Sequence, residues 1–118
     1  MLKRAADSPF PSLVDRFVSY AKVHTQSSEE SDTYPSAIQF DLAKILVEEL
    51  KALGLEDAAV DDHCYVTASL PATAGCENVP TIAFIAHVDT YPEVSGKNVQ
   101  PTFHENYQGG DLALPKNG

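Results

Sequence analysis

The sequence has 118 residues, of which 43% are hydrophobic and 21% are charged, an ordinary composition for a globular domain with a modest core. Its formal net charge is −9 and it holds only eight Lys and Arg residues, so it lacks the clustered positive charge that binds phosphate backbones and we expect no nucleic-acid partner. No apolar run approaches the ~20 residues that span a bilayer, and none follows the basic pair near the start, so we expect no membrane association and a cytoplasmic protein.

The first predicted element is a helix from Ser8 to His24. Its apolar residues recur at helical spacing and would form one face; they are Leu13, Val14, Phe17, Val18 and Ala21. Ser8 or Ser12 could cap its start. The polar residues 25–33 that follow are typical of a loop.

A second and clearer helix is predicted from about Ser36 to Leu53. An apolar stripe runs along it, formed by Ile38, Leu42, Ile45, Leu46, Leu50 and Leu53. Pro35 fits the first turn, and Gly54 sits where a left-handed residue would end the helix.

The pattern then changes to that of strands. Residues 58–61 and 65–70 predict two short strands, and residues 71–80 predict a loop rich in proline and glycine. Residues 81–86 are almost wholly apolar without alternation, which is typical of a strand covered on both faces. Because helices alternate with strands, the predicted class is α/β.

The apolar run ends in Ala86-His-Val-Asp-Thr90, which carries the sharpest chemical signal. Ligands of open α/β sheets bind beyond the carboxyl ends of the strands, and residues two apart on a strand point to the same side. A zinc-bound imidazole normally donates its second N–H to a carboxylate or a carbonyl. His87 and Asp89 are therefore candidates for a metal ligand and its support. On this motif alone, a histidine satisfied within a loop is the commoner case.

Other reactive residues take ordinary interpretations. Cys64 and Cys76 match no zinc or redox spacing, so we expect reduced thiols, with a disulfide left open. Asp61, His63 and Cys64 could bind a metal in principle, but their spacing is typical of no site we can name.

The whole run from Ile82 to Leu114 resembles peptidase T, a tripeptide aminopeptidase of the di-zinc family that also contains aminoacylases and carboxypeptidases. The strand ending in His87-Val-Asp89 is the part common to that family. The segments Ser95-Gly-Lys-Asn-Val99 and Tyr107-Gln-Gly-Gly-Asp111 are more specific to peptidase T.

The resemblance implies a fold and a set of roles. Residues 1–118 would form the N-terminal part of a zinc-peptidase-like catalytic domain, with helices packed on a mixed, largely parallel sheet, and the rest of that domain and a lid or dimerisation domain would be absent. His87 falls where the family places a ligand to one of two zinc ions, and Asp89 where it places an acidic catalytic residue. No other cofactor is implied, and the substrates would be short peptides, tripeptides above all.

The resemblance also predicts that the isolated chain is inactive, because the remaining ligands and the general-base glutamate would lie later in the sequence. Two alternatives stay open. One is a related zinc dipeptidase or deacylase. The other is a truncated, non-catalytic domain that associates with itself, since a truncated parallel sheet leaves an exposed edge strand.

Overall fold

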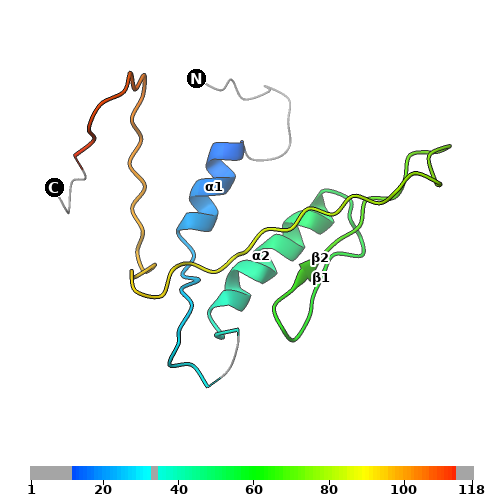
Figure 1. Ribbon diagram of the computed structural model, residues 1–118, viewed down its shortest axis with the longest axis horizontal. Coiled ribbons are helices and arrows are strands. Elements are labelled where there is room, and N and C mark those ends of the chain that lie inside the picture. The colour runs from blue at the N-terminus through cyan, green and yellow to red at the C-terminus, as the bar shows by residue number, and fades with distance from the viewer. Residues whose placement is uncertain (1–11, 33–34, 114–118) are drawn as a thin grey trace.

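The computed structural model describes residues 12–32 and 35–113. In chain order they form α1 (Leu13–Ala21), α2 (Gln39–Ala52), β1 (Ala59–Val60) and β2 (Val66–Thr67) (Figure 1). The α/β class is thus confirmed. The chain is open rather than closed, since its radius of gyration is 17.9 Å and a compact domain of this length has about 13–14 Å. Neither described helix combines the length and the apolar character needed to cross a membrane.

The start of α1 is fixed by a capping box. The Ser12 hydroxyl accepts a hydrogen bond from the Asp15 backbone N–H at 3.1 Å, and the Asp15 carboxylate accepts one from the Ser12 N–H at 3.4 Å. Ser12 is thereby confirmed as a cap, whereas Ser8 lies outside the described residues. The helix ends at Ala21, so the predicted extension to His24 is wrong.

The end of α2 follows the sequence closely. Gly54 has φ +92°, its N–H donates to Lys51 O at 2.9 Å, and the N–H of Leu55 donates to Leu50 O at 3.0 Å. These two bonds make a Schellman motif, which satisfies carbonyls that the last helical turn leaves free. The start differs from the prediction, because residues 36–38 form a turn and the helix begins at Gln39.

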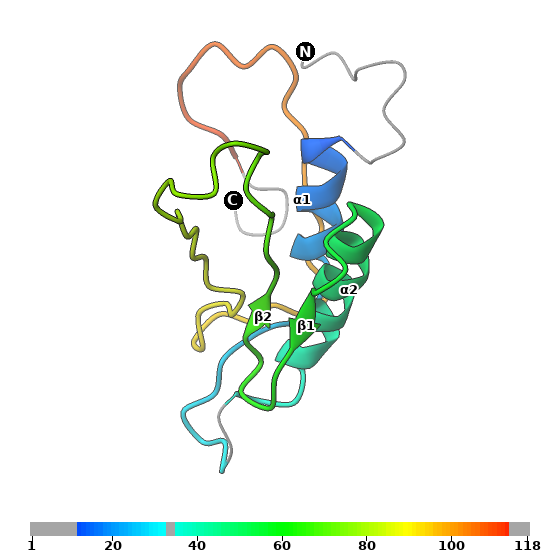
Figure 2. The same ribbon diagram turned by 90° about the vertical axis from the view of Figure 1, so that its right-hand side faces the viewer.

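The two short strands pair as an antiparallel hairpin, with Ala59 opposite Thr67 and Val60 opposite Val66. Asp61 shapes the connecting turn, because its Oδ1 accepts hydrogen bonds from the backbone N–H groups of His63 and Tyr65, each at 2.9 Å. This hairpin lies against α2, and α1 lies on another side of the same helix (Figure 2).

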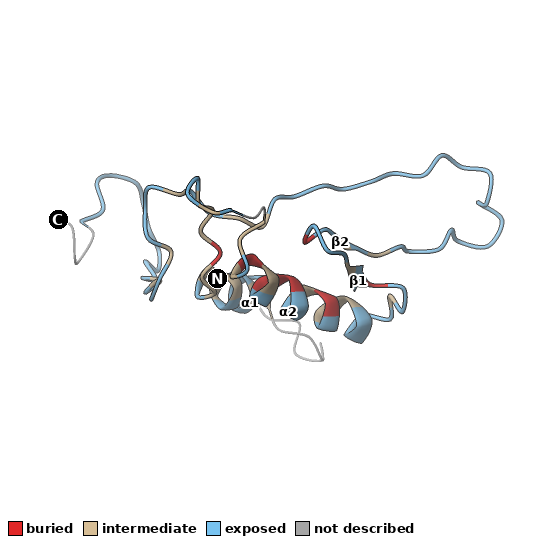
Figure 3. Cartoon of the chain, turned by 90° about the horizontal axis from the view of Figure 1, so that it is seen from below, coloured by how far each residue is buried: buried red, intermediate tan, exposed pale blue. Residues whose placement is uncertain are grey.

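The core is small and sits between α2 and the hairpin. The buried apolar residues of the described chain are Leu42, Ala43, Val47, Ala58 and Cys64. The buried face of α2 differs from the predicted stripe, since Ile45 and Leu53 are 40% and 44% exposed. Figure 3 shows one face of α2 buried toward the hairpin and the opposite face in solvent.

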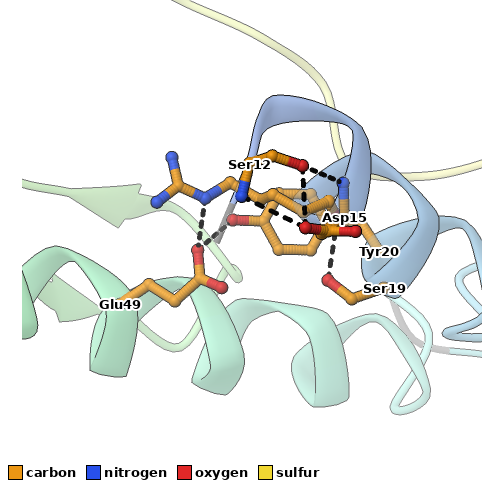
Figure 4. Close-up of polar contacts among 6 residues, drawn as sticks. Ser12, Asp15, Ser19, Tyr20 and Glu49 are labelled. Atoms are coloured by element: carbon orange, nitrogen blue, oxygen red, sulfur yellow. Dashed lines mark hydrogen bonds and ion pairs between the residues drawn. The ribbon is translucent and has the colours of Figure 1, made fainter. Parts of the chain in front are cut away.

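A polar cluster joins α1 to α2 (Figure 4). Arg16 Nε of α1 lies 3.2 Å from Glu49 Oε2 of α2, and the Tyr20 hydroxyl donates a hydrogen bond to the same oxygen. Arg16 Nε makes no hydrogen bond of regular geometry, so its contact with Glu49 is an ion pair. Burial, followed by the hydrogen bond to Glu49 and the charge of that carboxylate, raises the pKa of Tyr20 to about 12.

Two sequence predictions about the sheet are wrong for the described residues. Residues 81–86 form no strand and run through solvent, with Phe84 and Ile85 each 96% exposed (Figure 3). Also, the sheet is antiparallel rather than largely parallel. The physical reason is the same for both: an apolar run becomes a covered strand only beside neighbouring strands and covering helices, and no strand of the described chain pairs with this run.

Candidate metal centre

His87 and Asp89 lie in contact just after the exposed apolar run. His87 Nδ1 is 3.0 Å from Asp89 Oδ1 and 3.0 Å from the Asp89 carbonyl oxygen. Both neighbours are acceptors, so a neutral ring must carry its proton on Nδ1. Nε2 is then left unprotonated, the state in which an imidazole nitrogen binds zinc.

The pair is open to solvent. The His87 side chain is 85% exposed and that of Asp89 is 44% exposed. The two side chains do not lie at the end of a buried strand, so the prediction from the apolar run is wrong on this point. The two side chains are nevertheless in contact, because the short loop from His87 to Asp89 turns both the carboxylate and the backbone carbonyl of Asp89 toward the His87 ring.

The donor set is incomplete for a catalytic zinc ion. Such a site uses about three protein ligands and an open position for water. Across residues 12–32 and 35–113, no group of three or more His, Cys, Asp or Glu side chains lies close enough to hold a metal ion. One imidazole with its supporting carboxylate therefore fits part of a zinc site, and the assignment of His87 and Asp89 to such a site stays a prediction.

A second segment reaches the pair from far away in the sequence. Thr90 forms a parallel bridge with Gln26: the Thr90 N–H donates to Thr25 O at 3.0 Å, and the Ser27 N–H donates to Thr90 O at 3.0 Å. The Ser27 hydroxyl donates to Thr90 O as well, at 3.0 Å. The polar residues 25–33 predict only a loop, because no periodic or spacing signal marks a single bridge between residues so far apart in the sequence.

The Gln26 side chain adds to this junction. Its Nε2 donates to Pro92 O, and its Oε1 lies 3.2 Å from His24 Nε2. His24 is thus a side-chain neighbour of the bridge and not a residue of α1. Gly96 packs closely against this junction. A Cβ atom at this position would lie 3.2 Å from Thr90 Oγ1 and 3.3 Å from His24 Cδ2.

An open depression of about 450 Å³ lies beside the junction. Its lining residues are His24, Gln26, Ser27, Ser28, Glu29, Glu30, Ile38, Pro92 and Glu93. His87 and Asp89 are not among them, so the depression neighbours the candidate metal pair without containing it.

The other reactive residues have structural explanations. Cys64 and Cys76 are both free thiols, the first buried and the second exposed. Burial, with a smaller contribution from the charge of Asp61, raises the pKa of the Cys64 thiol. Asp61 Oδ1 accepts the two hydrogen bonds that shape the turn of the hairpin. His63 stacks on Tyr65 with ring centroids 6.3 Å apart.

Comparison with known proteins identifies the relatives of the chain. No protein-family model matches it. It is 55% identical over 104 residues to peptidase T of Alkaliphilus oremlandii, a match that covers 86% of this chain and 25% of that protein. It is 53% identical over 105 residues to peptidase T of Geobacillus kaustophilus, covering 88% and 25% of the two chains. Peptidase T of Clostridium botulinum is 51% identical over 105 residues, covering 88% and 26%.

The matches extend far beyond the short motif at His87, which alone would be weak. The chain spans about a quarter of the length of these relatives. The resemblance inferred from its segments is confirmed, and over most of its own length the chain is related to peptidase T.

Proposed function

We propose that the chain carries one part of the zinc site of an aminopeptidase that releases the N-terminal residue from short peptides, tripeptides in particular, in the cytoplasm. The observation that supports this most directly is the His87 ring, which meets two acceptors at Nδ1 and leaves Nε2 free. The likeness to peptidase T over 86% of the chain supports the substrate class.

In this proposal, His87 holds one zinc ion through Nε2, and Asp89 keeps the proton on Nδ1 and the ring in place. The negative carboxylate also makes the imidazole a better electron-pair donor. Bound zinc would supply a Lewis acid that polarises the scissile carbonyl and lowers the pKa of a bound water. Because one imidazole is too few for a catalytic site, the chain by itself is inactive and forms the N-terminal part of the catalytic domain. The rest of the length that its relatives have would supply the other ligands.

The test compares the 118-residue chain with the complete enzyme, meaning this chain joined to that remaining length. Zinc content and tripeptide hydrolysis are measured for each, with His87→Ala as the variant and the exposed His104→Ala as its matched control. We expect the complete enzyme to lose zinc and nearly all turnover in His87→Ala and to keep both in His104→Ala. Turnover by the 118-residue chain above a metal-free blank would contradict the proposal.

The same assay separates the related enzyme classes. Dipeptides and N-acyl amino acids are offered beside tripeptides at equal concentration. Faster turnover of either would favour a zinc dipeptidase or a deacylase, because specificity resides in the site and not in the fold.

The exposed run at residues 81–86 favours a second, non-catalytic candidate. Ile82, Phe84 and Ile85 are 77%, 96% and 96% exposed, and an extended apolar run without a partner strand is a template for pairing with another chain. We propose self-association of the 118-residue chain through this run. Sedimentation at increasing concentration should show larger species that Ile85→Lys removes and that Leu70→Lys, at an exposed position outside the run, does not. A chain that stays monomeric at every concentration would exclude this candidate.

A further inference from the structure

The Asp89–Thr90 peptide group connects the candidate metal pair to the residues that follow α1. Its carbonyl oxygen lies 3.0 Å from His87 Nδ1, and its N–H donates to Thr25 O at 3.0 Å. The C=O and N–H of one peptide bond lie in a single plane. Fixing the N–H end therefore fixes the direction in which the carbonyl meets the histidine ring.

Three further contacts hold the backbone just after this peptide, at the Thr90 and Pro92 carbonyls. The Thr90 carbonyl accepts hydrogen bonds from the N–H and from the hydroxyl of Ser27, each at 3.0 Å. Two residues further on, Pro92 O accepts from the Gln26 side chain. Thr25 is only 2% exposed, so its carbonyl is anchored in the interior and not on a free loop.

The His87 ring needs such a restraint, because packing does not provide one. With the side chain 85% exposed, its orientation depends on the two contacts at Nδ1. Hydrogen bonds in a chain also polarise one another, so a Thr90 N–H that donates to Thr25 makes the Asp89 carbonyl a stronger acceptor.

We propose that residues 25–27 act as a positioning segment for His87. They orient the Asp89–Thr90 peptide, and that peptide holds the imidazole with its proton on Nδ1 and Nε2 free. The benefit for zinc binding rests on the function proposed above, but the orientation of the ring does not, so the two can fail separately.

The test reads the tautomer of His87 directly. Long-range ¹H–¹⁵N correlation spectra of the 118-residue chain distinguish Nδ1–H from Nε2–H rings, and His87→Ala assigns the signal. Spectra are taken at increasing pH, and the tautomer ratio is read where it no longer changes with pH. The variant is Gln26→Ala/Ser27→Ala, which removes the side-chain bonds to Pro92 and Thr90.

The matched control is Gln108→Ala/Ser95→Ala, since these side chains bond only to nearby backbone, at Asn106 O and Lys97 N. We expect the ratio of Nδ1–H to Nε2–H at His87 to fall about fivefold in the positioning variant, the equivalent of one ordinary hydrogen bond. The ratio in the control should stay at the wild-type value. An unchanged ratio in the positioning variant, or an equal fall in both, would overturn the proposal.

A second variant covers the case in which the double substitution unfolds the chain, as circular dichroism of the helices would report. Ser27→Ala alone removes one hydroxyl and keeps the backbone bridge. For this variant we expect the Nδ1–H to Nε2–H ratio to fall roughly twofold, which corresponds to about half the free-energy change of the double variant. In the complete enzyme the zinc dissociation constant should rise by the factor by which the fraction of His87 rings carrying the proton on Nδ1 falls. A normal tautomer response without any zinc binding would refute the proposed function and leave the positioning role intact.

Discussion

Removing the charge of Asp89 while keeping its shape tests the supporting role of that residue. In Asp89→Asn the amide oxygen can still accept from His87 Nδ1, which now lies 3.0 Å from Oδ1. The variant therefore loses the negative charge and not the hydrogen-bond geometry. We expect the complete enzyme to fold normally and to bind zinc more weakly.

The size of the effect follows from the exposure of the pair. A residue that supports a metal-bound histidine typically contributes about 10–100-fold to metal affinity. Here the two side chains are 85% and 44% exposed, and water screens charges at the surface so that even an exposed pair of full charges contributes only about 0.2–1 kcal/mol. A charge-assisted hydrogen bond exceeds a neutral one by about 1 kcal/mol, which is roughly fivefold. The structure thus puts the loss near the lower limit, at about 5- to 10-fold.

The assay is competition for zinc against a chromophoric chelator, with tripeptide turnover measured on the same samples. Asp62→Asn is the matched control, because it makes the same change in net charge at an exposed position in the hairpin turn. Zinc affinity and kinetics of Asp89→Asn equal to those of the control would remove Asp89 from the site. A loss of more than about 100-fold would show that the pair is far less solvated than its exposure implies.

Three further predictions concern the scaffold. Leu42 is 6% exposed, so Leu42→Ala should lower the free energy of unfolding by about 2–3 kcal/mol in urea titrations. Leu53 is 44% exposed, so Leu53→Ala should change the same quantity by less than about 1 kcal/mol. Equal effects of the two substitutions would contradict the assigned core. The pKa of Tyr20 is raised from 10.0 to about 12 in the folded chain. The stabilisation from its protonated hydroxyl is therefore complete below pH 10 and is lost as the pH rises toward 12. Tyr20→Phe should lack this part of the pH dependence of unfolding, and a pH profile identical to that of the wild type would refute the contact with Glu49. The exposed Cys76 should react with a thiol reagent well before the buried Cys64, whose pKa is raised by burial; the variant Cys76→Ser should abolish the fast phase.

The features that the sequence predicted well are those governed by neighbours in the chain. Ser12 caps α1 because its hydroxyl and the Asp15 amide are three residues apart, and Gly54 ends α2 because only a left-handed residue completes that motif. The contact of His87 with Asp89 is equally local. In each case the interacting atoms lie within one turn of helix or one short loop.

The features that the sequence did not predict depend on distant partners. The apolar run at residues 81–86 has the composition of a covered strand, but coverage comes from other elements, and Phe84 is 96% exposed here. The bond from Ser27 to Thr90 joins positions 63 residues apart. A polar tripeptide such as Thr25-Gln-Ser27 has many acceptable partners, so no pattern within it could identify Thr90.

The junction between residues 25–27 and Thr90 has a consequence for limited proteolysis. Residues 69–87 are exposed throughout, and exposed segments of this kind are preferred sites of cleavage. Their two ends are anchored, at β2 on one side and at Thr90 on the other. A protease that cuts between these anchors would break the covalent path from the hairpin to His87. The fragment with His87 would then be held to the remainder without a covalent link, so its release on dilution measures the strength of that junction.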